Sequence, residues 1–289
     1  MQEPTKTVLK HLLRPFNLVL PASPYGTRFK VPVMRGIGGS HRTGSEPWMV
    51  DALARVFRAS GRAGLIDIGV NVGQTLLKLR SLDRHCRYIG FEPNPFCAQL
   101  VNELIALNDL QNTLIMPVGL SNRAGLVDFV AESEGDGAAS MMREVRPHTS
   151  AFRKQYIATL VFDEIAADLD VDEIPAVKID VEGAELEVIS GMRGFLRRAR
   201  PFVICEVLHA STPAQIEFKR ARNDQLMHLL REVDYVCLRI QKGERLASVT
   251  GFAPVERFPD DVWDPRASAA VCDYLFVARE RLDDAMAAL

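Results

Sequence analysis

The segment Leu65–Thr75, which reads L-I-D-I-G-V-N-V-G-Q-T, constrains the fold of this chain more than any other stretch. A short apolar run that carries Asp67 is followed by Gly69, Asn71 and Gly73 at alternate positions, and then by a helical pattern. This succession predicts a buried strand, a tight loop and a helix N-terminus. Glycines let a backbone approach a ligand, and asparagine tolerates the left-handed conformation. The free N–H groups of a helix start favour an anionic ligand group.

Three interpretations of this segment are open. It can be an ordinary strand–turn–helix with incidental glycines, because short motifs occur by chance. It can bind a dinucleotide, but that fingerprint is G-x-G-x-x-G, and the segment has D-x-G-x-N-x-G without the third glycine. The acid at the strand end suits a ligand that carries ammonium and hydroxyl groups, as S-adenosylmethionine does. We favour this last interpretation.

Composition describes an ordinary globular protein. The chain has 289 residues, of which 47% are hydrophobic and 25% charged, enough for one large α/β domain or two small ones. The net charge of -2 lacks the basic excess of a nucleic-acid-binding protein. The five cysteines are odd in number and form no C-x-x-C pair, which indicates a reducing compartment without structural zinc. We therefore expect a cytoplasmic protein, and no apolar run approaches the ~20 residues of a membrane-spanning helix.

Residues 1–60 lack alternating βα order and are predicted to form an N-terminal helical cap on a domain of residues 61–289. The cap contains a Pro/Gly-rich patch over residues 21–44 and an expected helix from Glu46 to Ala59. The apolar stretch Val8–Leu20 is a poor secretory signal. We expect it to dock on the core domain; contact with a membrane surface or with the second copy of a homodimer is the alternative.

From Gly64 onward, apolar strands alternate with helical segments. Strands are expected at residues 87–92, 112–118, 157–161, 175–180, 201–206, 235–240 and 273–278, with a hairpin partner at 126–130. Strands this uniformly apolar are covered on both faces, which predicts a mostly parallel sheet with helices on each side. The glycine-rich segment from Glu132 to Ser150 and the Pro-rich insert Phe252–Pro265 are expected to run over the surface and to shape a substrate pocket.

Acids end four of the expected parallel strands, at Asp67, Glu92, Asp180 and Glu206. Ligands of open α/β sheets bind outside the carboxyl ends of the strands, so these side chains are expected to converge. Four carboxylates at one edge repel one another unless a ligand, a cation or a hydrogen-bond donor meets them. The pattern therefore predicts a ligand site at this edge.

Glu92 has the position of a ribose-binding acid. It follows Asp67 by 25 positions, about where an acid in a mononucleotide-binding fold accepts hydrogen bonds from ribose hydroxyls. The alternative is an acid in the first turn of a helix, which the helix dipole also favours. Asn94 can support the same loop. An adenine ring can lie against the end of the next strand, at Gly119, Leu120 and Ser121.

Four motifs taken together, I-D-I-G-V-N-V-G, G-F-E-P-N-P, P-V-G-L-S-N and V-K-I-D-V-E-G-A-E, resemble the FkbM family of S-adenosylmethionine-dependent methyltransferases. They lie between Leu65 and Met192, with Cys205–Glu206 as a weaker extension. The resemblance implies a Rossmann-like class I methyltransferase fold whose seven-stranded, mostly parallel sheet includes a reversed last strand. It also implies methyl transfer to a hydroxyl of a sugar, glycan or natural product. The cofactor loop would comprise Asp67, Gly69, Asn71 and Gly73, with Glu92 at the ribose.

Methyl transfer to a hydroxyl requires a general base, and several side chains are candidates. Asp180 comes first, because Lys178 projects from the same strand face and can orient its carboxylate or lower its pKa. The alternative is a Lys–Asp pair that only stabilises the strand end. Glu206 flanks the same edge. His209, three residues later, is a second candidate base, unless it is a surface residue.

A divalent cation could be held by Asp180, Glu182 and Glu206, but the three acids lack a clear Asn or His partner and we do not favour it. Two other functions stay open. A nicotinamide-dependent sugar oxidoreductase or epimerase is disfavoured by the missing third glycine and by the absence of a Tyr-x-x-x-Lys pair. A non-catalytic methyltransferase-fold subunit is disfavoured by the intact acids at all four strand ends.

Overall fold

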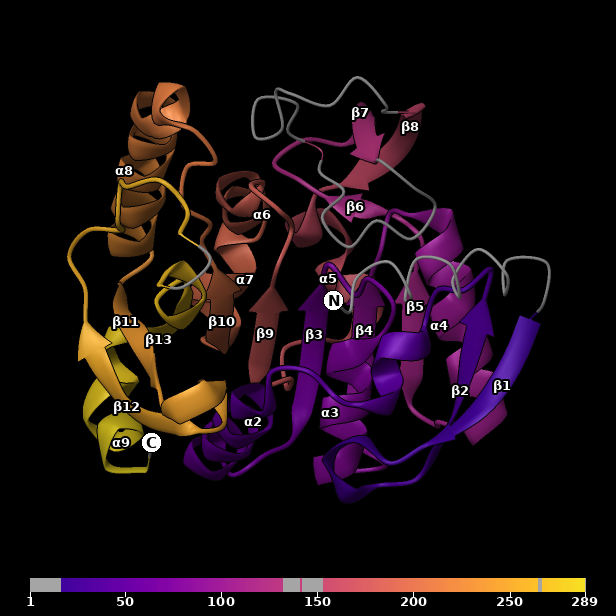
Figure 1. Ribbon diagram of the computed structural model, residues 1–289. Helices are drawn as coiled ribbons and strands as arrows, with labels where there is room; N and C mark the ends of the chain where they lie inside the picture. The colour runs from indigo at the N-terminus through magenta and orange to yellow at the C-terminus, as the bar shows by residue number, and fades with distance from the viewer. Residues whose placement is uncertain (1–16, 132–140, 142–152, 265–266, 289) are drawn as a thin grey trace.

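The computed structural model describes residues 17–131, 141, 153–264 and 267–288. Its centre is an eight-stranded sheet with the spatial order β12 (Val249–Pro254), β11 (Tyr235–Lys242), β13 (Asp273–Ala278), β10 (Phe202–Glu206), β9 (Ala176–Ile179), β3 (Gly64–Ile68), β4 (Arg87–Phe91) and β5 (Thr113–Met116), as Figure 1 shows. All expected strands are present, although the one expected at residues 157–161 belongs to a second, smaller sheet. The predicted α/β class is confirmed.

The direction of the strands matches the class I methyltransferase arrangement. The neighbours from β10 to β5 are parallel. Strand β13 is antiparallel to both β10 and β11, so a reversed last strand enters the sheet as expected. The sheet has one strand more than the seven predicted, because the residues from Val249 to Pro254 pair with β11 as an extra antiparallel edge. It is therefore a mixed sheet.

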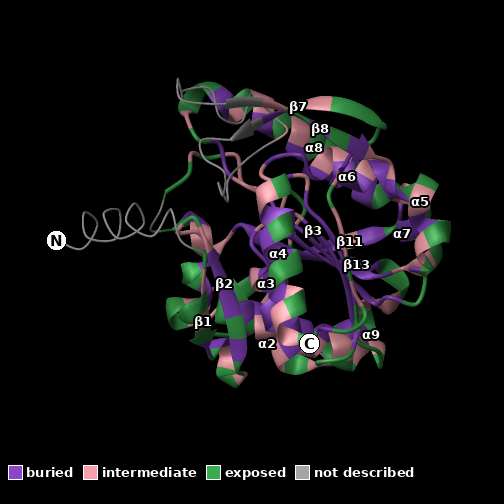
Figure 2. Ribbon diagram, turned by 90° about the vertical axis from the view of Figure 1, so that its right-hand side faces the viewer, coloured by how far each residue is buried: buried purple, intermediate pink, exposed green. Residues whose placement is uncertain are grey.

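Helices cover both faces of the sheet (Figures 1 and 2). Ile66, Val177 and Val203 share one buried cluster with α5 (Phe162–Leu169), α6 (Glu185–Gly191), α7 (Arg193–Ala199) and α8 (Ile216–Glu232). Leu65, Ala176 and Ile204 share another with α2 (Pro47–Ser60), α3 (Gln74–Leu82), α4 (Pro95–Asn108) and α9 (Leu282–Ala288). Alternate residues of each strand thus enter opposite cores, which explains the uniformly apolar strands.

The N-terminal region is only partly helical. Strands β1 (Asn17–Ala22) and β2 (Phe29–Met34) form an antiparallel hairpin where a helical cap was expected. Helix α2 matches the predicted helix, and its buried Trp48 and Leu53 belong to the core cluster of the sheet. Most of the apolar stretch from Val8 lies outside the described residues. The domain boundary after residue 60 and the homodimer stay predictions.

A second, three-stranded sheet has the order β6 (Gly119–Leu120), β8 (Arg153–Leu160) and β7 (Gly125–Ala131). The segment expected as a hairpin partner of the preceding strand is a strand, but the pairing is different, since β7 pairs antiparallel with β8 and lies in another sheet than β5. Figure 1 shows this small sheet beyond the C-terminal ends of β3 and β4. Of the glycine-rich segment 132–150, only Met141 is among the described residues.

The Pro-rich insert Phe252–Pro265 was expected on the surface, and this expectation is wrong in part. Its start belongs to β12, and Phe258 is buried with its ring against the rings of Tyr274 and Phe276. Short 3-10 turns occur at Pro24–Gly26, Gly39–Arg42, Pro213–Gln215, Glu244–Leu246, Ser268–Ala270 and Arg279–Arg281. All five cysteines are buried and free. Among the described residues, no helix has the length and apolar character needed to cross a membrane.

Candidate active site

The loop after β3 has the backbone that its sequence predicts. Gly69 has a φ of 88°, and a Cβ there would lie 1.8 Å from the carbonyl oxygen of Asp180, so only glycine fits. Asn71 has a left-handed φ of 52°. Gly73, with a φ of 91°, is the N-cap of α3. The loop therefore passes tightly between the ends of β3 and β9 and begins the helix.

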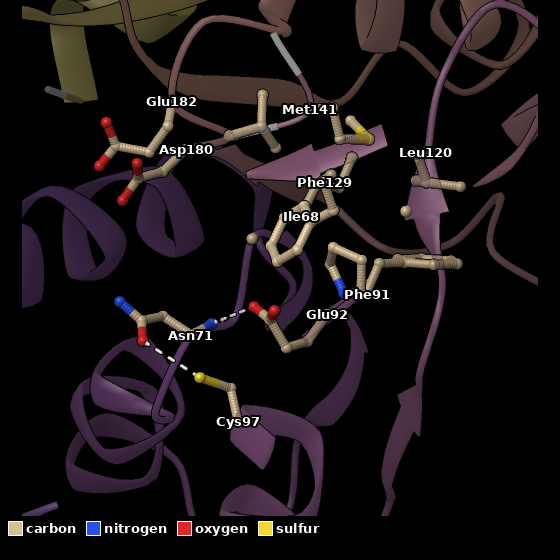
Figure 3. A pocket seen from close by; sticks show the side chains of 14 residues that line it. Ile68, Asn71, Phe91, Glu92, Cys97, Leu120, Phe129, Met141, Asp180 and Glu182 are labelled. Carbon is tan, nitrogen blue, oxygen red and sulfur yellow. Dashed lines mark hydrogen bonds between the residues drawn. The ribbon is translucent and has the colours of Figure 1, made fainter. Parts of the chain in front are cut away.

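A pocket lies over this loop, at the ends of β3, β4 and β9. Figure 3 shows Asn71 and Glu92 on one side of it, Asp180 and Glu182 together on another, and Phe129 between them. The lining residues are Ile68, Gly69, Asn71, Phe91, Glu92, Pro93, Cys97, Gly119, Leu120, Phe129, Met141, Asp180, Val181 and Glu182. The pocket thus combines an apolar interior with carboxylates at both ends.

Glu92 is a buried carboxylate oriented by backbone. One oxygen accepts a 2.6 Å hydrogen bond from Asn71 N and the other a 2.8 Å bond from Asn94 N. Burial raises the pKa of Glu92 to about 7, against the opposing effect of these N–H groups. Each carboxylate oxygen can accept a further hydrogen bond. The Asn94 side chain accepts from Phe96 N and caps α4, so Asn94 supports the loop through its own backbone N–H.

Asp67 lies beneath the loop and is not among the residues that line the pocket. It is fully buried, accepts a 2.6 Å hydrogen bond from Tyr88 Oη and lies 3.5 Å from Lys178 Nζ. Burial raises the pKa of Asp67, while the Lys178 ammonium opposes the shift. Asp67 therefore supports the loop from beneath and does not line the pocket. Tyr88 was missed in the sequence analysis. On β4, Gly90 pairs with Asp67, and Tyr88 lies two residues earlier on the same strand face, which is the signal that could have identified it as a partner of Asp67.

Lys178 joins two of the predicted acids. Its Nζ lies 3.1 Å from Asp180 Oδ2 and donates to the Gly69 carbonyl at 3.1 Å. Burial alone would lower the pKa of Lys178, but the Asp180 and Asp67 carboxylates raise it. Burial would likewise raise the pKa of Asp180, yet the Lys178 ammonium holds it below its ordinary value. Asp180 is therefore ionised and paired at the pocket wall.

Glu206 lies beside Asp180 and hydrogen-bonds with it. Burial, reinforced by the charges of Asp180 and Asp273, raises the pKa of Glu206 well above its usual range. Of the two neighbouring carboxyls, Glu206 is therefore the one that is more easily protonated, and its protonation relieves the repulsion expected at this edge. His209 is buried, and its Nδ1 hydrogen-bonds Asp261 Oδ1, so the surface interpretation of this histidine is wrong.

The remaining predicted positions divide between the pocket and its surroundings. Gly119 and Leu120 line the pocket, whereas Ser121 is buried nearby with its Oγ directed to Asn122 Oδ1. Phe129 lines it too and was missed, because it follows the first strands by a long connection and carries no motif. Met141, which lies in the segment 132–150 expected to shape a pocket, also lines it. Among the described residues, no group of three or more His, Cys, Asp or Glu side chains has the arrangement of a metal site.

The pocket and its acids fall within a recognised domain. A family model described as the methyltransferase FkbM domain matches residues 67–237, more than half of the chain. The chain belongs to the FkbM family. The matched residues begin at Asp67 and include the loop after β3, Glu92, Lys178, Asp180 and His209, so the FkbM domain contains most of the candidate site.

Curated relatives of this FkbM protein include methyltransferases from three organisms. The 2-O-methyltransferase NoeI of Sinorhizobium fredii is 27% identical over 148 residues, which is 47% of this chain and 60% of the relative. The hexuronic acid methyltransferase AglP of Haloferax volcanii is 29% identical over 182 residues, 61% and 70% of the two chains. Methyltransferase sdnD of Sordaria araneosa is 25% identical over 154 residues, 44% and 60%. The chain thus spans about 60% of the length of two of these relatives.

A solved FkbM methyltransferase structure, from Methylobacillus flagellatus, is 16% identical with a TM-score of 0.43 and covers 74% of this chain and 43% of that one.

Proposed function

We propose that this FkbM-family protein transfers the methyl group of S-adenosylmethionine to a hydroxyl group of a sugar or glycan. The observation that carries the proposal is the buried Glu92 carboxylate, which Asn71 N and Asn94 N orient at the pocket wall. The acceptor class rests on the names of two relatives, a 2-O-methyltransferase and a hexuronic acid methyltransferase.

The pocket fits the donor at several points. The second acceptor sites of the Glu92 oxygens suit the two ribose hydroxyls. The crowded loop at Gly69, which leaves no space for a Cβ, suits close approach of the methionine half. Leu120 and Phe129 supply apolar wall for the adenine ring. When bound, the donor supplies a methyl group already activated by its sulfonium.

The protein has two tasks left: to align the acceptor hydroxyl and to take its proton. Alignment can supply roughly 7–11 kcal/mol, and a general base typically ~10²–10⁴-fold. Asp180 and Glu182 face the pocket opposite Glu92 and are the groups that would hold acceptor hydroxyls. Lys178 and Glu206 hold Asp180 in place.

Calorimetric titration tests the donor. We expect S-adenosylhomocysteine to bind and NAD not to bind, and Glu92→Leu to abolish the heat of S-adenosylhomocysteine binding. Glu103→Leu, an exposed substitution on α4, is the control and is expected to bind normally. Binding of NAD in place of S-adenosylhomocysteine would point to a nicotinamide-dependent oxidoreductase.

Methyl transfer itself is tested with radiolabelled donor and fractionated cell extract. We expect label to enter a carbohydrate fraction with the wild type and not with Glu92→Leu. Binding of S-adenosylhomocysteine without transfer to any fraction would favour a non-catalytic subunit instead.

A further inference from the structure

A buried histidine of the N-terminal region contacts the loop that follows β3. His41 is 2% exposed, and its Nε2 lies 2.7 Å from the Val72 carbonyl oxygen. A carbonyl oxygen only accepts hydrogen bonds, so Nε2 carries the ring proton and donates it to Val72. His41 belongs to the Pro/Gly-rich patch over residues 21–44, which precedes the family match at residues 67–237. The contact therefore brings a side chain from outside the matched domain to the candidate site.

The other ring nitrogen of His41 has no such contact. Nδ1 is buried and has no hydrogen-bond partner among the described residues. Burial lowers the pKa of His41, although the Val72 carbonyl opposes the shift, so the ring is mainly neutral at neutral pH. An apolar ring would fill the same space without a buried, unpaired nitrogen, which is unfavourable. What histidine supplies here, and an apolar residue does not, is the hydrogen bond to Val72.

A tight turn after β2 places His41 against the loop. Gly38 has a φ of 99°, and a Cβ there would lie 2.3 Å from the Pro32 carbonyl oxygen, so only glycine fits. The chain continues into the 3-10 turn Gly39–Arg42, in which His41 N donates to the Gly38 carbonyl at 3.2 Å. A small apolar cluster joins the same segment to the loop and consists of Met34, Ile37, Val72, Phe96, Cys97 and Leu100. Backbone and apolar packing thus fix the position of the imidazole relative to the loop.

Val72 lies between two residues with left-handed backbone. Asn71 has a φ of 52° and Gly73 a φ of 91°. The Val72 carbonyl and the Gly73 N–H belong to one planar peptide group, so the hydrogen bond from His41 fixes the orientation of this plane. On the other side of Val72, Asn71 N donates at 2.6 Å to Glu92, as Figure 3 shows. The imidazole thus acts one residue away from the N–H group that orients the Glu92 carboxylate.

We propose that His41 is a positioning residue of the donor site, which through Val72 keeps Asn71 N directed at Glu92; this rests on the proposed function, which assigns the donor to this loop. His41 is not among the pocket-lining residues, so it acts through the loop. Its hydrogen bond goes to the loop and not to a reacting atom. Loss of this bond should therefore weaken donor binding and leave the rate of methyl transfer from the bound donor unchanged.

Two substitutions separate the hydrogen bond from the bulk of the side chain. His41→Phe keeps a buried ring and removes the donor N–H, whereas in His41→Gln the amide nitrogen can take the place of Nε2 and donate to Val72. We expect the Kd for S-adenosylhomocysteine, measured by calorimetry, to rise ~10-fold in His41→Phe and to stay within ~3-fold of the wild type in His41→Gln. His228→Phe, at a histidine whose side chain is 73% exposed, is the matched control and should bind as the wild type does.

Turnover distinguishes positioning from catalysis. With radiolabelled donor and the carbohydrate fraction that the wild type labels, we expect His41→Phe to raise the KM for the donor by about the same factor as the Kd. The kcat is expected to stay unchanged. A fall in kcat at saturating donor would contradict the positioning role.

The stoichiometry of the calorimetric titration and the Tm distinguish loss of folding from loss of affinity. An unchanged Kd in His41→Phe would overturn the proposal whatever the Tm, because a merely structural contact affects only stability. An equal loss of affinity in His41→Phe and His41→Gln would show that the N–H group is not what matters. Failure of the proposed function is distinct, because the wild type itself would then not bind S-adenosylhomocysteine.

Nitrogen-15 NMR of the histidine rings gives a readout that needs no ligand. We expect His41 in the wild type to carry its proton on Nε2 with Nδ1 unprotonated at neutral pH. The spectrum of His41→Gln identifies the His41 signals by their absence. A wild-type His41 with its proton on Nδ1 could not donate to Val72, and this result would refute the proposal.

Discussion

Lys178 Nζ lies 3.1 Å from Asp180 Oδ2, across the end of a single strand. The same ammonium lies 3.5 Å from the Asp67 carboxylate on β3 and donates to the Gly69 carbonyl. One buried cation thus connects two strand ends and the loop between them. The acids of this edge coexist because a lysine from the same edge is shared among them.

Replacing this cation is expected to destabilise the protein strongly. Lys178→Met leaves the buried Asp67 carboxylate and the partly exposed Asp180 carboxylate without their counter-charge. Removing one partner of a buried pair, as here for Asp67, typically costs ~3–5 kcal/mol. The measurement is the free energy of unfolding by urea denaturation. Lys30→Met removes an exposed lysine and is expected to change stability by less than ~0.5 kcal/mol. Equal effects of the two substitutions would contradict the role of Lys178.

Ligand binding is expected to release a proton through Glu92. Its pKa of about 7 lies above the ordinary 4.5, and ribose hydroxyls donate best to the ionised carboxylate. Below pH 7 binding must therefore displace a proton, and the affinity for S-adenosylhomocysteine should fall as the pH decreases. Calorimetry at pH 6 in buffers of different ionisation enthalpy measures the proton released. We expect up to one proton for the wild type and none for Glu92→Gln.

Glu92 should also weaken the fold as the pH rises. Because its folded pKa is the higher one, the folded state binds more protons than the unfolded state between pH 4.5 and about 7. The free energy of unfolding contributed by this group therefore falls as the pH rises through that window, by about 3 kcal/mol at most. Urea denaturation at pH 5 and pH 8 should show a smaller decrease for Glu92→Gln than for Glu103→Gln. The same decrease in both variants would assign the effect to other groups.

Motifs predicted the parts of the site that come from contiguous sequence. The loop at Gly69, the acid Glu92 and the edge acid Asp180 each follow a buried strand directly, so strand direction alone brings them to one edge. Asp67 shows the limit of this approach. Its sequence position is that of a strand-end acid, but a hydrogen bond from Tyr88 and the charge of Lys178 keep it beneath the loop.

Parts of the fold that depend on distant pairing could not be predicted. Strand β12 forms because the residues from Val249 onward pair with the edge of β11. Phe258 is buried because its ring packs against the rings of Tyr274 and Phe276. Asp261 reaches His209 through a bridge between segments 52 residues apart. Local periodicity carries no information on such pairs.

Gly69→Ala is expected to damage both stability and donor binding. The added Cβ would lie 1.8 Å from the Asp180 carbonyl oxygen, so the loop or the end of β9 must shift. Gly26→Ala is the matched control, because Gly26 has a similar φ of 80° but nothing within 4 Å of a Cβ. Gly26→Ala should cost only the ~1–2 kcal/mol of a left-handed residue. Similar losses of S-adenosylhomocysteine binding in the two variants would show that crowding at Gly69 is unimportant.

Phe129→Ala tests whether the small sheet forms part of the nucleoside site. The Phe129 side chain is 3% exposed and lines the pocket from β7, a strand outside the central sheet. Its loss removes apolar wall without touching Glu92 or Asp180, so the Kd for S-adenosylhomocysteine should rise at least ~10-fold, the equivalent of 1.4 kcal/mol. Leu126→Ala, on the same strand but 75% exposed, should leave the Kd unchanged. Calorimetry measures the Kd of each variant for S-adenosylhomocysteine. An unchanged Kd in Phe129→Ala would place the adenine elsewhere, because removing a ring that contacts the nucleoside must reduce the contact area.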